Sequence, residues 1–100
     1  MEITRFGPPE ARGIDLDCDI YFTLNRPEVD TLSSPITQAA IVAMLAPGAP
    51  PFGAIAAVLV LNYISIMKDR AGPSGVSVKC TIRQGAGFVT QMKEFIAEPI

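Results

Sequence analysis

The sequence predicts an α+β domain in which an antiparallel sheet of three to four strands packs against an apolar helical hairpin. Two segments far apart in the chain alternate apolar and polar residues, which is typical of strands buried on one face. Between them lies a long apolar stretch with the start and stop signals of two helices. A chain of 100 residues supports one hydrophobic core, so we expect a single domain over residues 1–100 with the order β-β-α-α-β-β.

The clearest strand is the segment IDLDCDIYFTLN, residues 14–25. Its apolar positions fall on one face: Ile14, Leu16, Cys18, Ile20, Phe22 and Leu24. GVSVKCTIRQG predicts a second strand over residues 76–83, with Val76, Val78, Cys80 and Ile82 turned inward. We expect the two strands to be neighbours, because Asp15, Asp17 and Asp19 then share an outer face with Lys79 and Arg83.

Three further segments give weaker signals. EITRF, residues 2–6, predicts another strand. The tail GFVTQMKEF fits two structures, since Phe88, Met92 and Phe95 suit a helical face while residues 89–92 suit a short strand. RQGAGF, which has glycines two apart and no acidic partner for a dinucleotide site, predicts the turn of a hairpin.

Both helices have recognisable ends. Ser34 is a suitable N-cap and Pro35 a suitable first residue, so we expect the first helix over residues 35–46, ended by APGAPP. The second helix is expected over residues 51–71, where Lys68 and Arg70 complement the dipole at its end. Small residues should bring the two helices together as a hairpin: Ala39, Ala40, Ala43, Gly53, Ala56 and Ala57.

The stretch between Asp30 and Lys68 contains no charged residue. Its core, FGAIAAVLVLNYISIM, is apolar on every side of a helix, including a stripe formed by Ile55, Leu59, Asn62 and Ile66. Such a helix is enclosed by its own chain, inserted in lipid or covered by another subunit. The run is shorter than the roughly 20 residues of a spanning helix, so a membrane role requires the hairpin to open and insert. Candidate membrane or partner contacts are Phe52, Ile55, Val58, Leu59, Leu61 and Tyr63.

Composition argues against several function classes. The chain has no histidine and a net charge of −2 without a basic patch, so we expect no nucleic-acid partner and no small-molecule substrate. The row DLDCD resembles the start of a calcium loop, but Ile20 replaces the required glycine and Arg26 the bidentate glutamate. We therefore expect no catalytic residue, metal or cofactor. The N-terminus lacks a secretory signal, which favours a cytoplasmic protein or export by a non-classical route.

Cys18 and Cys80 both fall on inward positions of their strands. Either they are buried thiols or, in a suitable register, they form a disulfide. Without a secretory signal the reduced state is favoured.

The segment AIAAVLVLNYISIMKDRAGPSGVSVKCTI resembles small bacterial proteins described as bacteriocin-like, in which an apolar helical hairpin ends in a charged pair before a Gly-Val strand. The matching positions are residues 56–67, Lys68 with Asp69, and Gly75 with Val76. The resemblance implies a secreted or membrane-directed antagonistic role. Two hypotheses follow: a non-enzymatic, membrane-active protein with the hairpin as effector, or a binding or assembly module that forms a homo-oligomer through the hairpin surface.

Overall fold

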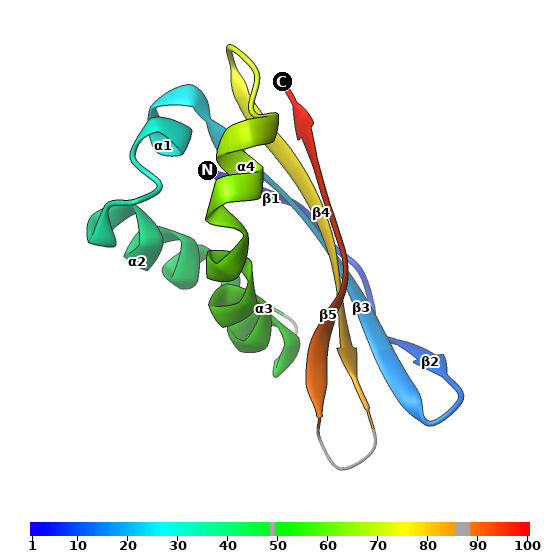
Figure 1. The fold of residues 1–100 in the computed structure, drawn as a ribbon. Coiled ribbons are helices and arrows are strands. Elements are labelled where there is room, and N and C mark those ends of the chain that lie inside the picture. The colour runs from blue at the N-terminus through cyan, green and yellow to red at the C-terminus, as the bar shows by residue number, and fades with distance from the viewer. Residues whose placement is uncertain (49, 86–88) are drawn as a thin grey trace.

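The computed structural model describes residues 1–48, 50–85 and 89–100, with a helical layer on one face of an antiparallel sheet (Figure 1). The strands are β1 (Glu2–Phe6), β2 (Glu10–Arg12), β3 (Asp15–Asn25), β4 (Gly75–Gln84) and β5 (Thr90–Pro99). β1, β3, β4 and β5 pair in that order, and β2 pairs with the first residues of β3. The α+β class and the antiparallel sheet are thereby confirmed.

The predicted neighbours β3 and β4 form the centre of the sheet. They pair without interruption from Leu16 opposite Gln84 to Asn25 opposite Gly75. Gly75 has a φ of +128°, and a Cβ atom there would overlap the carbonyl oxygen of Leu24. Glycine is therefore needed at this position for β4 to begin so close to the end of β3.

The tail forms the strand β5. A β-bulge within this strand makes its sequence pattern ambiguous. Glu94 lies opposite Thr81, but the next pair joins Met92 to Ile82, so Lys93 is an extra residue. The bulge shifts the alternation, and Met92 and Phe95 both pack against the core although they are three residues apart. That spacing imitates a helix. Phe88 and the centre of the predicted turn lie outside the described residues.

The helical layer contains α1 (Arg26–Asp30), α2 (Pro35–Leu45), α3 (Phe52–Val60), the 3₁₀ turn η1 (Leu61–Tyr63) and α4 (Ile64–Arg70). The predicted order β-β-α-α-β-β is wrong, because three strands precede the helices and α1 and β2 were not expected. α1 has a capping box, in which Asn25 accepts from the Glu28 N–H and the Glu28 side chain accepts from the Asn25 N–H.

The predicted helical hairpin is also wrong. α2 packs on α3, whereas α4 packs on β4, β5 and α1. Figure 1 shows that the two helical segments diverge from the turn that joins them. A Cβ atom on Gly53 would overlap the Leu45 carbonyl oxygen, so α2 and α3 approach each other closely next to the turn that joins them. Ala39, Ala40 and Ala43 are exposed instead of packed between helices.

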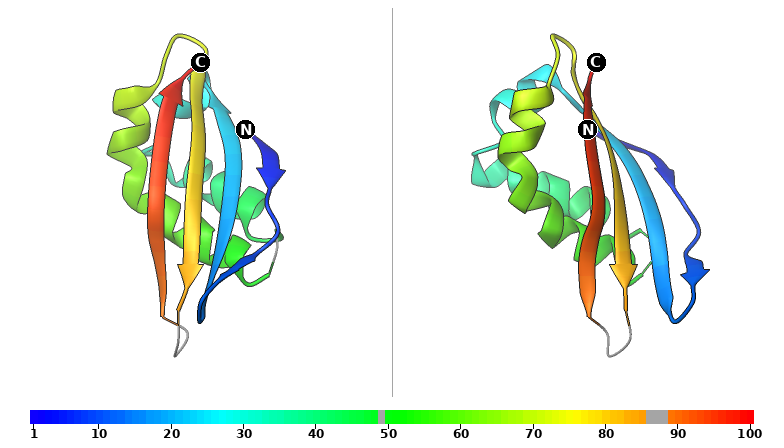
Figure 2. Two further views of the ribbon diagram at one scale, coloured as in Figure 1. Left: turned by 90° about the vertical axis from the view of Figure 1, so that its right-hand side faces the viewer. Right: turned by 45° about the vertical axis from the view of Figure 1, so that its right-hand side comes forward.

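The core lies between the helices and one face of the sheet. Figure 2 shows the helices behind that face, while the opposite face is open. Fully buried side chains come from both layers: Ile20, Phe22 and Leu24 on β3, Val76, Val78 and Ile82 on β4, and Ile41, Leu45, Val60 and Met67 on the helices. The sheet therefore covers the inner side of the apolar helices. Each buried aliphatic side chain contributes roughly 1.5–3 kcal/mol to the stability of the fold.

Candidate functional site

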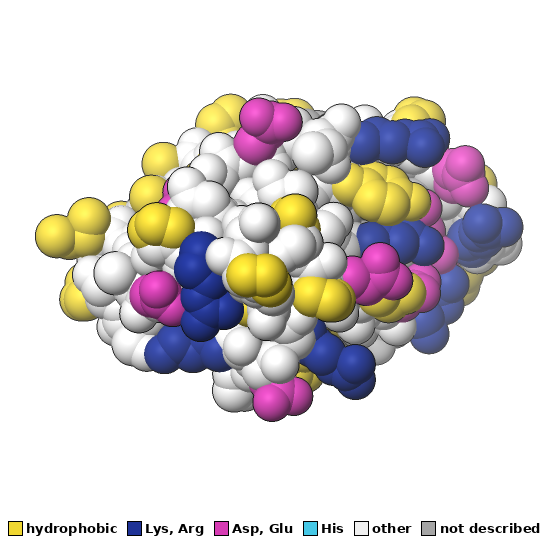
Figure 3. Space-filling model, turned by 90° about the horizontal axis from the view of Figure 1, so that it is seen from above, with side chains coloured by type: hydrophobic (Ala, Val, Ile, Leu, Met, Phe, Trp, Pro, Cys, Tyr) yellow, Lys and Arg dark blue, Asp and Glu magenta, His cyan; other side chains and the backbone are white. Residues whose placement is uncertain are grey.

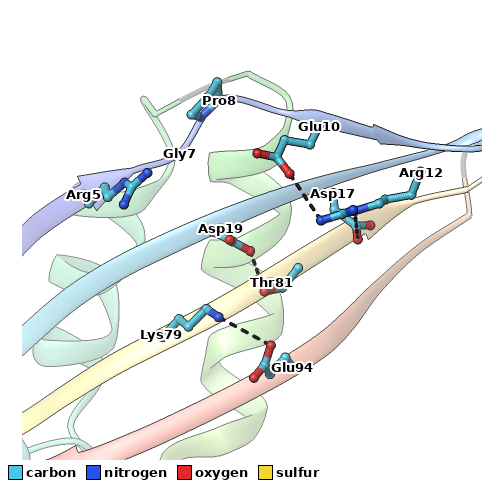
Figure 4. Close-up of a pocket in the computed structure, with 10 residues that line it drawn as sticks. All are labelled: Arg5, Gly7, Pro8, Glu10, Arg12, Asp17, Asp19, Lys79, Thr81 and Glu94. Atoms are coloured by element: carbon cyan, nitrogen blue, oxygen red, sulfur yellow. Dashed lines mark hydrogen bonds and ion pairs between the residues drawn. The ribbon is translucent and has the colours of Figure 1, made fainter.

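The open face of the sheet carries a polar pocket of about 220 Å³ (Figure 4). Charged side chains of opposite sign pair across its strands. Arg83 donates to both carboxylate oxygens of Asp17, at 2.7 and 2.9 Å. The Thr81 hydroxyl donates to Asp19 at 2.6 Å, and Lys79 lies 3.6 Å from Glu94. Because these charges compensate one another, the pocket is a cross-strand network that supports the sheet register.

The electrostatics of this network do not suit acid catalysis. The hydrogen bonds from Arg83 lower the pKa of Asp17, which keeps this carboxylate ionised. A general acid working near neutral pH needs the opposite shift. Within residues 1–48, 50–85 and 89–100, no cluster of three or more acidic or cysteine side chains has the geometry of a metal site. The DLDCD row is strand, as expected from its alternation.

Both cysteines are buried free thiols. Cys18 lies opposite Ile82 and Cys80 opposite Ile20, so the two are staggered along neighbouring strands. The Cys18 thiol donates to the Gly7 carbonyl at 3.3 Å. Burial raises the pKa of Cys80 to about 12, and it raises the pKa of Cys18 as well. Neither sulfur has the thiolate character of a nucleophile.

The predicted contact residues on the second helix divide into two groups. Phe52 is 2% exposed and belongs to the core, and the ring of Tyr63 stacks on Phe95 with centroids 4.3 Å apart. Val58 is 67% exposed, and Ile55 and Leu59 are half-buried. Leu61 is also half-buried. Phe52 is therefore not available to a membrane or partner in this structure. Ile55, Val58 and Leu59 form a partly exposed flank of α3.

That flank lies beside β5, the edge strand of the sheet. The larger of two grooves there has a volume of about 480 Å³ and is lined by Ile66, Asp69, Arg70, Phe95, Ile96, Ala97 and Glu98. We call it the edge groove. A second groove, of about 320 Å³, is lined by Ala54, Ile55, Val58, Leu59 and Thr90. Viewed towards the open face, the helix projects beyond β5 (Figure 2, left).

The two grooves lie along the same helical segment, the lower beside Ile55 and Leu59 and the edge groove beside Ile66. These residues belong to the helical stripe of Ile55, Leu59, Asn62 and Ile66, which is visible as a pattern in the sequence. Sequence reasoning missed the β5 side of the grooves, namely Phe95 and Ile96. Nothing in the local pattern signals that β5 is at the edge of the sheet, because strand order depends on long-range pairing.

Charge is unevenly distributed over the face of the molecule that is seen from above. Seen from above, Lys, Arg, Asp and Glu gather towards the sheet, while the end occupied by α2 carries hydrophobic and neutral side chains (Figure 3). The segment Phe52–Arg70 forms a helical stretch of 19 residues with mean hydropathy 1.5, of which 33% is buried. By length and composition it could cross a membrane, a test that core helices also pass.

Comparisons with protein-family models, with curated proteins and with solved structures find no match to this chain.

Proposed function

We propose that the chain is a non-enzymatic assembly module that forms a homo-oligomer through the outer flank of α3 and α4. One observation carries this proposal: the stripe of Ile55, Leu59, Asn62 and Ile66, apolar except at Asn62, is partly open beside an edge strand. Ile66 within the stripe is 43% exposed, and Val58 beside it is 67% exposed. Exposed apolar surface is typical of protein interfaces.

The surroundings of the stripe support the same function. At its far end the edge groove is bordered by Asp69, Arg70 and Glu98. An apolar centre with a charged rim is the usual composition of an interface between proteins. The open face of the sheet differs, because it is rich in charged side chains, of which Asp17 with Arg83 and Lys79 with Glu94 pair with one another. The flank of α3 and α4 therefore offers a partner apolar side chains such as Val58 and Ile66, which association would remove from water.

Light scattering with matched variants tests the proposal. We expect the wild-type protein to have the mass of two or more chains, and Ile66→Glu and Val58→Glu to dissociate it, because a buried unpaired carboxylate is costly. Ile36→Glu is the control, since Ile36 is 82% exposed on α2, away from this flank. A wild-type mass of one chain up to high concentration would overturn the proposal.

A second candidate function is membrane association, which the bacteriocin-like resemblance implies. The observation that favours it is the apolar helical stretch Phe52–Arg70, only one third of which is buried. In this function the helix leaves the sheet and inserts into lipid. Leakage from vesicles of neutral phosphatidylcholine and of anionic phosphatidylglycerol, measured from acid to neutral pH, tests it. Leakage that Val58→Glu abolishes supports this function, and intact vesicles at every pH exclude it.

A further inference from the structure

The polar pocket on the open face of the sheet contains two charges that have no ionic partner. Most of the charged side chains that line it pair with an opposite charge: Glu10, Arg12, Asp17, Lys79 and Glu94. Arg5 on β1 and Asp19 on β3 also line the pocket (Figure 4). Neither of these two forms an ion pair with any described residue. One positive and one negative charge therefore remain available to a ligand.

Asp19 is held in position by two neighbouring segments. The Thr81 hydroxyl donates to its Oδ1 atom, and the Gly7 N–H donates to its backbone carbonyl at 2.8 Å. A Cβ atom on Gly7 would lie 3.1 Å from that carbonyl oxygen, so the connection between β1 and β2 passes close to β3. The Oδ2 atom of Asp19 accepts no hydrogen bond from the described part of the chain. This oxygen is the acceptor that a ligand can use.

Arg5 is positioned by an aromatic ring. Its guanidinium carbon lies 5.7 Å from the centroid of the Tyr21 ring, which is within the range of a cation–π contact. Arg5 is opposite Tyr21 in the sheet, and Tyr21 follows Asp19 by two residues on β3. Two residues along a strand span about 7 Å. The positive and negative charges therefore belong to adjacent rows of the sheet, and only the pairing of β1 with β3 brings them to one pocket.

We propose that this pocket binds a small zwitterion, such as a short ω-amino acid, with its carboxylate at Arg5 and its ammonium at Asp19. A ligand with one charge is attracted by one of these side chains and repelled by the other, whereas a zwitterion places each charge beside its opposite. The pocket volume of about 220 Å³ is below the roughly 300–1,000 Å³ of sites for drug-sized ligands, so it suits a smaller molecule.

The proposed site is separate from the surface proposed for self-association. It lies on the open face of the sheet, whereas the flank of α3 and α4 belongs to the helical layer. Zwitterion binding therefore goes beyond the assembly function and does not depend on it.

Amide chemical-shift titration by NMR tests the proposal. At constant ionic strength, γ-aminobutyrate should cause saturable shifts at the amides of Gly7 and Thr81, which line the pocket. Exposed ion pairs are weak, so we expect a dissociation constant in the millimolar range. Butyrate and butylamine each carry one of the two charges and should bind about threefold more weakly or worse. The absence of saturable shifts with γ-aminobutyrate, or equal affinity for butyrate or butylamine, overturns the proposal.

Two conservative variants test the role of each charge. Asp19→Asn keeps an oxygen that accepts from Thr81 but removes the negative charge, so γ-aminobutyrate should bind about threefold more weakly and butyrate more tightly. Arg5→Gln should weaken γ-aminobutyrate to a similar extent and favour butylamine. Glu2→Gln is the control, because Glu2 is exposed on β1 and does not line the pocket. If Asp19→Asn and Arg5→Gln bind all three ligands as Glu2→Gln does, the proposed site is wrong.

Discussion

Asp17 on β3 and Arg83 on β4 lie directly opposite each other in the sheet and form an ion pair with two hydrogen bonds. A second guanidinium, that of Arg12 on β2, lies 3.9 Å from the same carboxylate. Asp17 thus joins three strands on the open face. The sequence predicts β3 and β4 as neighbouring strands from charges of opposite sign on their outer faces, and this ion pair is one of the expected contacts.

The first prediction concerns the pH dependence of stability. Arg83 lowers the pKa of Asp17 below its ordinary value of 3.8 in the folded protein. The ion pair therefore contributes fully above pH 3.8, and its contribution is lost as the pH falls through the lower folded pKa. We expect Asp17→Asn to lower the urea midpoint at pH 7 and to have less effect near pH 2. Glu2→Gln, which changes an exposed carboxylate, should be neutral at both; equal losses for Asp17→Asn at both pH values would contradict this prediction.

The second prediction separates the two sides of the long helix. Met67 is fully buried against the sheet, so Met67→Ala should destabilise the fold by about 2–5 kcal/mol in urea unfolding. Val58 is exposed, and Val58→Ala should change the stability of dilute protein by less than about 0.5 kcal/mol. Similar losses at the two positions would mean that the sheet does not cover the inner side of this helix.

The third prediction concerns the thiols. Because Cys18 and Cys80 are buried and the pKa of Cys80 is raised to about 12, neither should react with Ellman's reagent at pH 8 in the native state. Both should react once guanidinium unfolds the chain. Rapid release of a thiol signal before unfolding, or no signal after it, would show that the cysteines are exposed or oxidised.

The fourth prediction tests the capping box of α1. Asn25→Ala removes the side-chain acceptor for the Glu28 N–H and should cost about 1 kcal/mol of unfolding free energy. Asn25→Ser keeps an oxygen at the cap and should remain close to the wild type. If both variants lose the same stability, the effect arises from the end of β3 and not from the cap.

Much of the fold was predictable because short-range patterns determine it. The alternating pattern predicted β3 and β4, and the Ser34 cap with Pro35 predicted α2. The predicted ends lie within one or two residues of the observed ones. β2 has only three residues, too few for a pattern. The residues of the capping box, Asn25 and Glu28, are visible in the sequence. The five-residue helix α1 was nevertheless not predicted, because it follows directly on a long strand.

The site was predictable only in part, because it depends on contacts between distant segments. The apolar stripe of Ile55, Leu59 and Ile66 follows from helical spacing alone. Helical spacing does not show which side of the helix the sheet covers. Phe52 and Val58 were therefore both predicted as contacts to a membrane or partner. The contribution of Ile96 could not be foreseen, since the bulge at Lys93 obscures the strand and the pairing order alone makes β5 an edge.

The mass of the protein in solution tests the central claim most directly. Measured by light scattering over a wide range of concentrations, the wild-type protein should approach the mass of two or more chains, and Ile66→Glu should stay at the mass of one. A wild-type mass of one chain throughout, or an Ile66→Glu variant that associates as the wild type does, would contradict the account.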